Sequence, residues 1–199
     1  MVRRKVEVRR EEILDAAVDE VEARGLAATR VADVAHALGV SPALVFYHFE
    51  TKERLLAAAL RHAVERDLAR LDAVMARART PVDQVRGILR LYAPQGKAPG
   101  WTLWVDAWAE ALRSDDMREV TRDLDRRWKD ALAEAIRSGN AEGTFACADP
   151  DAAAWRLTAL LDGLAVQVTV TRNLTRAQLN RWVRGAAAAE LGVPAERLG

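Results

Sequence analysis

The sequence contains one cysteine, Cys147, among its 199 residues. A single cysteine cannot form a disulfide within its own chain, which excludes a disulfide-stabilised scaffold and favours a reducing compartment. No cation flanks Cys147 to lower the pKa of its thiol. We therefore interpret it as a small loop residue rather than as a redox sensor.

Long apolar runs are also missing. No run approaches the roughly 18 residues that would span a bilayer. The first residues, MVRRKVEVRREE, lack the apolar stretch of about 7–15 residues that a secretory signal carries. Half of the residues are apolar and 30% are charged, a mixture typical of a globular chain of one large or two small domains. We expect a cytoplasmic protein that does not contact membranes.

The sequence also lacks a large excess of charge of either sign. Thirty basic and 29 acidic residues leave a formal net charge of +1, so bulk charge gives no argument for a polyanionic partner. The first ten residues are an exception, because five of them are basic and one is acidic. The basic residues of this arm are Arg3, Arg4, Lys5, Arg9 and Arg10. Any nucleic acid would have to be held by such localised charges.

Strand-like alternation is rare, and apolar residues recur instead at three- and four-residue spacings. With abundant alanine, the best helix former, this predicts an all-α fold of about nine helices. Gly25 and Gly39 are expected to end the first two helices, and Pro42 and Pro81 to begin later ones. The helices are expected over residues 8–24, 29–38, 42–49, 52–79, 81–92, 101–113, 116–138, 150–172 and 175–191.

Residues 29–49 have the pattern of a helix-turn-helix unit. Thr29 opens a helix that ends at Gly39, whose missing Cβ permits a tight turn, and Ser41 caps a short third helix. At about 1.5 Å per residue the third helix is ~10–12 Å long, which fits across a DNA major groove about 12 Å wide. The same arrangement occurs in helical proteins that do not bind DNA, so spacing alone leaves both interpretations open.

The third helix should have an inner and an outer face. A rotation of about 100° per residue turns Val45 and Phe49 toward the first two helices. The outward side chains are Ala43, Leu44 and Tyr47, with His48 at the margin. Apolar side chains offer only contacts such as one to a thymine methyl, whereas a hydroxyl or imidazole reaches phosphate oxygens. Arg30 and Lys52 begin helices and are candidate phosphate clamps.

The run REEILDAAVDEVEARGLAATRVADVAHALGVSPALVFYHFETKERLL resembles the amino-terminal domain of the tetracycline-repressor (TetR) family of bacterial regulators. Members share a run that ends in GVS. A few residues later an aromatic pair and HF follow, and two residues after these come K and then L. The diagnostic residues are Ile13, Ala16, Ala17, Gly25, Thr29, Ala35, Gly39, Val40, Ser41, Tyr47, His48, Phe49, Lys52 and Leu55. The resemblance implies an all-helical homodimer that binds a palindromic operator and usually represses until a small ligand enters the carboxy-terminal domain.

The same resemblance implies eight operator contacts, which fall on Thr29, Arg30, Ser41, Ala43, Phe46, Tyr47, His48 and Lys52. One position departs from the family pattern. Many members have Tyr at the first position of the aromatic pair, where its hydroxyl contacts phosphate, and this chain has Phe46. Because that hydrogen bond cannot form, Tyr47, Lys52 and the basic arm would have to hold the DNA backbone.

Composition divides the chain in two. All three histidines lie within the first 62 residues, and all six tryptophans lie after residue 100, so the composition changes around residues 60–80. We expect a helix-turn-helix DNA-binding domain over residues 7–67, with its recognition unit at 30–49. A larger helical domain for ligand binding and dimerisation is expected over residues 68–199, joined to the first through the fourth helix.

The carboxy-terminal region contains the stretch W-x-x-W-x-x-x-W-x-E and the run LLDGL. These features resemble the branch of the TetR family that includes choline-type and nucleobase-type regulators. Trp101, Trp104 and Trp108 share a helix face, and Trp128 and Trp155 are expected on neighbouring helices. Both an aromatic pocket for a flat or cationic ligand and a core stripe of large residues remain open.

Three carboxylates accompany the tryptophans. Asp162 lies in the otherwise apolar run 157–170, where a buried carboxylate needs a partner, either a bound cation or an arginine of another helix. Asp106 and Glu110 are expected on a solvated face. The candidate ligand residues, for an unidentified small-molecule effector, are Trp104, Trp108, Trp128 and Asp162.

Small residues in the last two helices predict a homodimer interface across a two-fold axis, with internal packing as the alternative for some of them. They are Ala152, Ala153, Ala154, Ala159, Gly163, Ala165 and residues 186–189. A dimer would also let paired helices read half-sites about one turn, ~34 Å, apart. We hypothesise that a ligand seated between the fourth and later helices displaces the fourth helix and changes that separation.

An enzyme is the competing class. The sequence has no H-E-x-x-H, no glycine-rich phosphate loop and no G-x-S-x-G, and His36, His48 and His62 lack the spacing of metal ligands. We therefore expect no catalytic residues, no metal and no cofactor. A metal-sensing regulator and a regulator whose pocket senses nothing are the remaining alternatives.

Overall fold

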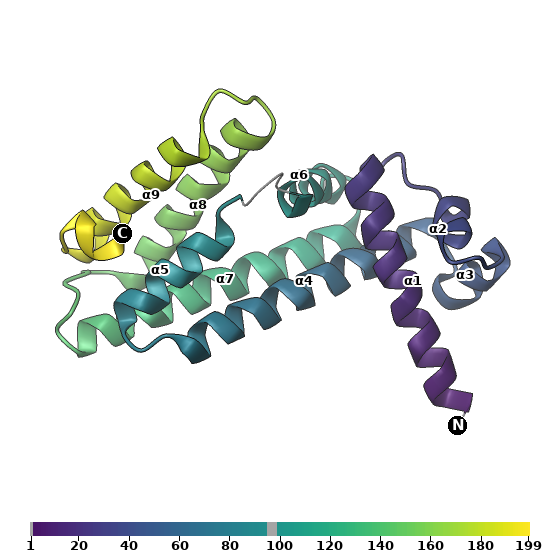
Figure 1. Cartoon of the computed structure of the whole chain (residues 1–199), viewed down its shortest axis with the longest axis horizontal. Helices are drawn as coiled ribbons and strands as arrows, with labels where there is room; N and C mark the ends of the chain where they lie inside the picture. Colours follow the sequence, from purple (N-terminus) through teal and green to yellow (C-terminus); the bar gives the residue numbers. More distant parts are fainter. Residues whose placement is uncertain (1, 95–98) are drawn as a thin grey trace. The chain divides into compact units, whose positions relative to one another are not determined.

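The structure is a computed structural model that describes residues 2–94 and 99–199, with side chains from residue 9 onward except that of Pro99. Within these residues the chain forms nine α-helices and one 3-10 helix, with no strand, which confirms the predicted all-α fold (Figure 1). The elements are α1 (Val2–Arg24), α2 (Val31–Ala37), α3 (Pro42–Phe49), α4 (Lys52–Arg77), α5 (Pro81–Tyr92), α6 (Pro99–Ala111), α7 (Asp115–Ala141), α8 (Pro150–Thr169), α9 (Arg176–Leu191) and η1 (Ala195–Leu198).

Two sequence features lie outside the described residues. They are the side chains of Arg3, Arg4 and Lys5 in the basic arm, and most of the loop predicted over residues 94–100. None of the described helices is long and apolar enough to cross a bilayer. The described residues form two compact units: unit 1 comprises Met1–Asp67 and Thr102–Arg122, and unit 2 comprises Leu68–Trp101 and Asp123–Gly199.

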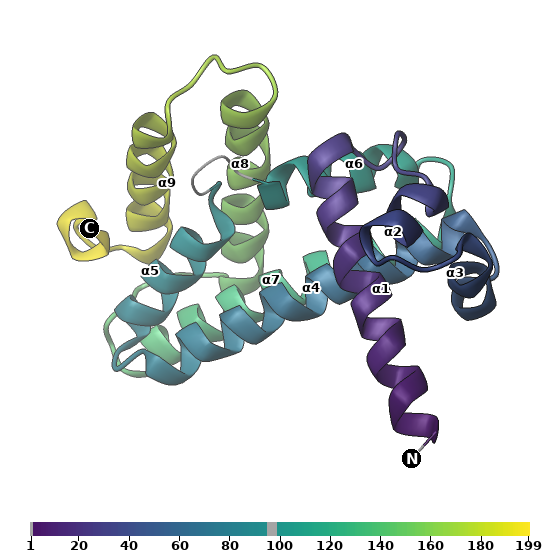
Figure 2. The same cartoon turned by 45° about the vertical axis from the view of Figure 1, so that its right-hand side comes forward.

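Unit 1 contains a helix-turn-helix built by local sequence signals. Gly25 and Gly39 have positive φ, at +84° and +64°, so both occupy the left-handed conformation that ends a helix at low cost for glycine. Ser41 caps α3 by accepting a hydrogen bond from the backbone N–H of Leu44, and Pro42 begins the helix. α2 packs on α1 and α3 packs on α2 (Figures 1 and 2).

The core of unit 1 confirms the predicted inner face of the third helix. Ile13 and Ala17 of α1, Val34 of α2, and Val45 and Phe49 of α3 are all buried in one apolar cluster. Burying a large aliphatic or aromatic side chain stabilises a fold by about 1.5–3 kcal/mol. These contacts fix the outward direction of the remaining α3 side chains.

Unit 2 is held by long helices with capped ends. Asp149 caps α8, and Thr175 and Gln178 form a reciprocal capping box at the start of α9. α8 and α9 lie side by side, as both views show (Figures 1 and 2). Leu157 and Leu161 of α8 and Leu179 of α9 are almost completely buried. The buried face of each helix leaves its opposite face available for other contacts.

Candidate functional site

The outer face of α3 is the most exposed aromatic surface of unit 1. Tyr47 is 78% exposed and Phe46 is 45% exposed, whereas a monomeric protein usually covers most of its aromatic surface. Ser41 and Ala43 at the start of the helix are exposed as well, and His48 is half-buried. The structure therefore places these five predicted contacts on or beside one helix surface.

The other three predicted contacts lie in the loop between α1 and α2 or bind to it. Thr29 is buried, and its hydroxyl donates a hydrogen bond to the carbonyl of Gly25 at 2.9 Å. Arg30 caps α2 with its backbone and has an exposed side chain. Lys52 reaches back from α4, and its ammonium donates to the carbonyl of Ala27 at 3.2 Å. Thr29 and Lys52 thus shape the loop that presents Arg30.

Asp106 of α6 also holds this loop. Its Oδ2 accepts a hydrogen bond from the backbone N–H of Leu26 at 2.8 Å, although 80 residues separate the two in sequence. A Cβ on Gly25 would lie 3.1 Å from the same oxygen, so the carboxylate fits closely against the turn. The expectation that Asp106 lies on a solvated face is wrong, because the carboxylate satisfies a backbone donor of unit 1.

Part of the basic arm can be followed in α1. The Arg10 guanidinium lies 5.0 Å from the centre of the Phe49 ring, a cation–π contact on the edge of α3. Arg9 is instead paired with Glu12 at 2.7 Å. The cation–π contact thus places one positive charge of the arm beside Phe49, an inner residue of α3.

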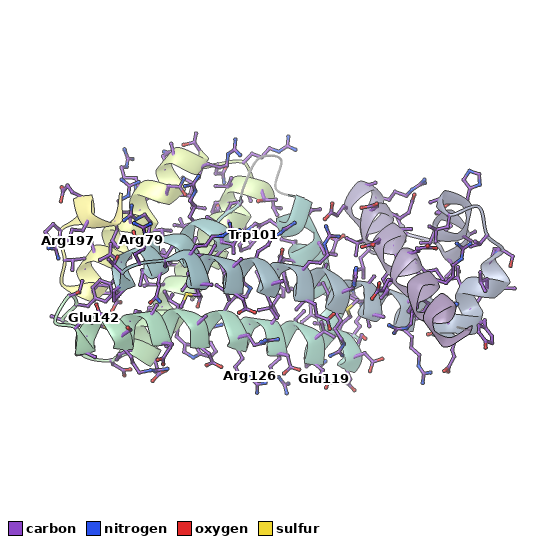
Figure 3. The ribbon with its side chains drawn as sticks, turned by 60° about the horizontal axis from the view of Figure 1, so that its bottom comes forward. Arg79, Trp101, Glu119, Arg126, Glu142 and Arg197 are labelled. Atoms are coloured by element: carbon purple, nitrogen blue, oxygen red, sulfur yellow. The ribbon has the colours of Figure 1, made fainter. Side chains whose placement is uncertain are left out.

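In unit 2, an aromatic cluster is centred on Tyr92, the last residue of α5. Its ring meets the Trp128 ring edge-to-face at a centroid distance of 5.1 Å and the Trp101 ring at 5.9 Å. The Trp101 indole N–H donates to the Tyr92 carbonyl at 2.9 Å. Figure 3 shows Trp101 at the first turn of α6. Trp101 and Trp128 are buried and Tyr92 is half-buried, so the cluster is packed within the unit.

Asp162 of α8 completes this cluster. Its Oδ1 accepts a hydrogen bond from the Tyr92 hydroxyl at 2.7 Å. Tyr92 is a partner that the sequence did not suggest, and no arginine pairs with Asp162 among the described side chains. Burial raises the pKa of Asp162, while the Tyr92 hydrogen bond opposes that rise and nearby Asp125 adds to it. Burial and the Asp162 charge raise the pKa of Tyr92, so its hydroxyl remains a donor.

A buried lysine lies close to this carboxylate. Lys129 of α7 pairs with Asp125 one turn earlier, and its ammonium lies 4.0 Å from the centre of the Trp155 ring. Its positive charge also lowers the pKa of Asp162. Lys129 is paired with Asp125, and Asp162 has no basic hydrogen-bond partner among the described side chains. Aromatic rings beside such a carboxylate form an environment suited to an organic cation.

The four predicted ligand residues divide between the units. Trp128 and Asp162 meet through Tyr92 in unit 2, whereas Trp104 and Trp108 belong to unit 1 and are half-buried there. Sequence reasoning did not place Tyr92 in the site, and it counted Trp101 among the tryptophans of a possible aromatic pocket without including it in the four ligand residues. Tyr92 and Trp101 lie on either side of the loop predicted over residues 94–100, and this could have indicated that they lie close together.

The outer faces of α8 and α9 carry apolar side chains that the chain itself does not cover. Trp155 is 60% exposed and Trp182 is 42% exposed. The small residues Ala159 and Gly163 of α8 and Gly185 of α9 are exposed, whereas Ala153, Ala154 and Ala165 are buried within unit 2. Part of the predicted small-residue stripe is therefore internal packing, and the rest forms an apolar surface.

Metal-ligating side chains do not gather in the part of the chain that the structure describes. No group of three or more His, Cys, Asp or Glu residues there could hold a metal ion. His62 instead pairs with Asp15 at 2.8 Å, and the thiol of Cys147 is buried.

Comparisons with known proteins agree with both parts of this geometry. A family model described as "Bacterial regulatory proteins, tetR family" matches residues 13–59, and one described as "BetI-type transcriptional repressor, C-terminal" matches residues 81–192. The HTH-type transcriptional regulator BetI of Brucella melitensis is 34% identical over 132 residues, covering 65% of this chain and 66% of that protein. The chain thus matches just under two thirds of the length of that relative. The BetI of Rhizobium meliloti is 29% identical, covering 80% and 77%.

Solved structures extend the likeness over nearly the whole chain. A transcriptional regulator from Saccharomonospora viridis, in complex with choline, is 30% identical with a TM-score of 0.83, covering 90% of this chain and 95% of that chain. A TetR regulator from Haloarcula marismortui shares the fold at 21% identity with a TM-score of 0.82, covering 94% and 97%. Because the carboxy-terminal family model alone matches more than half of the chain, this protein belongs to the TetR family of transcriptional regulators.

Proposed function

We propose that the protein is a repressor that binds a palindromic operator in the cytoplasm through the outer face of α3. The exposed pair Phe46 and Tyr47 carries this proposal, since a solvent-facing aromatic pair on a capped recognition helix has no packing role in unit 1. Tyr47 and the ammonium of Lys52 would contact phosphates, and Ala43 would contact a base edge. Arg30, Ser41 and His48 flank this surface, and buried Thr29 would act by positioning the loop.

The domain assignment follows the same proposal. Residues 7–67 would form the DNA-binding domain, with the recognition unit at 30–49, and residues 68–199 would form the ligand-binding and dimerisation domain. The two matched family models, over residues 13–59 and 81–192, support this division. Asp106, which belongs to residues 68–199, also stabilises residues 7–67 by accepting the hydrogen bond of the Leu26 backbone N–H.

We propose that the effector is an organic cation of the choline class and binds beside Tyr92, Trp101 and Trp128. A quaternary ammonium group lacks N–H donors, so it is held by aromatic faces and by a nearby negative charge rather than by hydrogen bonds. The cluster offers both, with Asp162 as the carboxylate. The choline-bound regulator from Saccharomonospora viridis supports this assignment. Trp104 and Trp108 of α6 are also among the predicted ligand residues, and we propose that they respond when the effector binds.

We propose that two copies associate through α8 and α9. Trp155, Trp182 and Val170 provide exposed apolar area. A Cβ added at Gly163 or Gly185 would meet nothing within 4 Å, so a partner helix could approach closely there. The Ala159→Arg variant should shift the protein to monomer in light-scattering chromatography. Ala69→Arg, at an exposed position of α4, is the matched control and should remain dimeric.

Titration of the purified protein with choline tests the effector assignment. We expect saturable heat of binding in the wild type and at least a tenfold loss of affinity in Trp128→Phe, which keeps a smaller aromatic ring, and in Asp162→Asn, which preserves size. The Trp182→Phe variant, which alters a tryptophan outside the cluster, should bind choline as the wild type does. Choline binding that is unchanged in both cluster variants would contradict the assignment, as would an absence of binding to the wild type.

A further inference from the structure

Helix α6 is shared between the two compact units. Its residues up to Trp101 belong to unit 2, and those from Thr102 onward belong to unit 1. The helix nevertheless runs without a break over Pro99–Ala111. Because an α-helix rises about 1.5 Å per residue, Trp101 and Asp106 lie about 7–8 Å apart along one stiff element. A displacement of the first turn is therefore passed along the helix to Asp106.

The first turn of α6 is attached to the aromatic cluster. The Trp101 indole N–H donates to the Tyr92 carbonyl, and the two rings meet edge-to-face. Trp101 is only 7% exposed and Trp128 only 6%, so an effector that binds among these rings has to displace one of them. Tyr92 is held by its hydrogen bond to Asp162, and Trp128 lies in the middle of α7. We therefore expect Trp101, in the first turn of its helix, to move and α6 to move with it.

Asp106 connects α6 to the turn that follows α1. Its Oδ2 accepts a hydrogen bond from the backbone N–H of Leu26, and a carboxylate holds such a donor more strongly than a neutral acceptor does. Leu26 is buried, so water does not readily replace the carboxylate. The same oxygen fits closely against Gly25, where a Cβ would lie only 3.1 Å away. A movement of α6 therefore moves this turn as well.

Hydrogen bonds within the loop connect this turn to α2. The Gly25 carbonyl accepts two of them from Thr29, one from the backbone N–H at 3.2 Å and one from the hydroxyl at 2.9 Å. Arg30 follows directly and is the N-cap residue of α2. In turn, α2 packs on α3, the proposed operator-reading helix. The position of Leu26 is thus coupled to the recognition unit through contacts within unit 1.

We propose that Asp106 is the positioning residue that transmits effector binding to the recognition unit. When the effector displaces Trp101, α6 shifts, and the hydrogen bond between Asp106 and Leu26 moves the loop and α2 with it. This inference rests on the effector and operator assignments proposed above. Coupling between two sites typically changes an affinity by about 5–150-fold. A hydrogen bond that only stabilised the fold would leave the ratio of operator affinities with and without effector unchanged.

Operator binding with and without choline tests the proposal. The measured quantity is the operator Kd at saturating choline divided by the Kd without choline, for the full-length protein on a duplex selected by the wild type. Asp106→Ala removes the acceptor of the Leu26 N–H, and Asp106→Asn keeps an oxygen at the same position. Glu110→Ala is the matched control on α6, because Glu110 pairs with Arg113 at 3.5 Å. Choline titrations and thermal melts show whether each variant retains the effector site and the fold.

We expect a ratio of about tenfold or more in the wild type and in Glu110→Ala, about threefold or less in Asp106→Ala, and about fivefold or more in Asp106→Asn, with choline affinity unchanged in all four. If Asp106→Ala does not fold, Asp106→Ser, whose hydroxyl has a shorter reach, replaces it with the same expectation. A wild-type ratio in the variant without the acceptor, or an equal loss in Glu110→Ala or Asp106→Asn, would overturn the role of Asp106. A wild type that choline does not release would instead contradict the effector assignment, and this inference with it.

Discussion

Replacing Asp106 tests whether α6 stabilises the loop that precedes the recognition unit. Its Oδ2 accepts the Leu26 N–H at 2.8 Å, and Leu26 is only 4% exposed, so few water molecules can replace the carboxylate. The Asp106→Ala variant removes a charge-assisted hydrogen bond and leaves a backbone donor unpaired. Asp106→Asn keeps an oxygen acceptor at the same position and loses only the charge.

The expected cost follows from the type of bond. A hydrogen bond to a charged group contributes about 1.5–3 kcal/mol, and a neutral one about 0.5–1.5 kcal/mol. For a chain of this size each kcal/mol changes the melting temperature by roughly 2–4 °C. Asp106→Ala should therefore melt about 3–12 °C below the wild type, and Asp106→Asn should lose about half as much.

Thermal unfolding followed by circular dichroism measures these differences. Glu110→Ala, one turn later on α6, is the matched control, because Glu110 makes only a surface ion pair with Arg113 at 3.5 Å. Such pairs contribute about 0–1 kcal/mol. If Asp106→Ala melted with the wild type, or if Glu110→Ala lost as much stability, the Leu26 hydrogen bond would not have the role assigned to it.

Three further outcomes are expected. Asp162→Asn should melt above the ligand-free wild type near neutral pH. Burial raises the pKa of Asp162, so the wild-type fold loses stability as pH rises through that raised pKa. In thermal melts from pH 3 to pH 8, the melting temperatures of the two proteins should converge at the acid end. Gly39→Ala should cost about 1–2 kcal/mol of unfolding free energy by chemical denaturation, from its φ of +64° alone, since a Cβ there meets nothing within 4 Å; no loss would contradict this. In DNA-binding titrations, Phe46→Tyr should tighten operator binding at an unchanged salt slope, whereas Lys52→Ala should weaken binding and reduce the slope by about one; identical slopes would remove Lys52 from the phosphate contacts.

The helix-turn-helix could be predicted from sequence because its signals are local. Gly39, Ser41 and Pro42 each determine a backbone conformation within a few residues, and the structure confirms the left-handed turn, the cap and the start of α3. Burial of Val45 and Phe49 also follows from helical geometry, once the helix is assigned.

The ligand site was harder to predict because its contacts are not local. Tyr92 and Asp162 are 70 residues apart, and no spacing rule relates the end of one helix to the middle of another. The sequence identified Asp162 as a carboxylate that needed a partner, and the structure adds one that the sequence did not suggest, the Tyr92 hydroxyl. Asp106 was assigned to a solvated face for the same reason, because its partner Leu26 lies 80 residues away.

Selection of duplex DNA from a random pool by the purified protein tests the central claim most directly. The account predicts enrichment of an inverted repeat whose half-sites are about one helical turn apart, with binding lost at least tenfold in Tyr47→Ala and unchanged in Leu112→Ala, an exposed apolar residue outside the proposed DNA-binding surface. Adding choline should release the selected DNA. A pool that shows no enriched sequence, or an enriched sequence that Tyr47→Ala binds as tightly as the wild type, would contradict the assignment of α3 as the operator-reading helix.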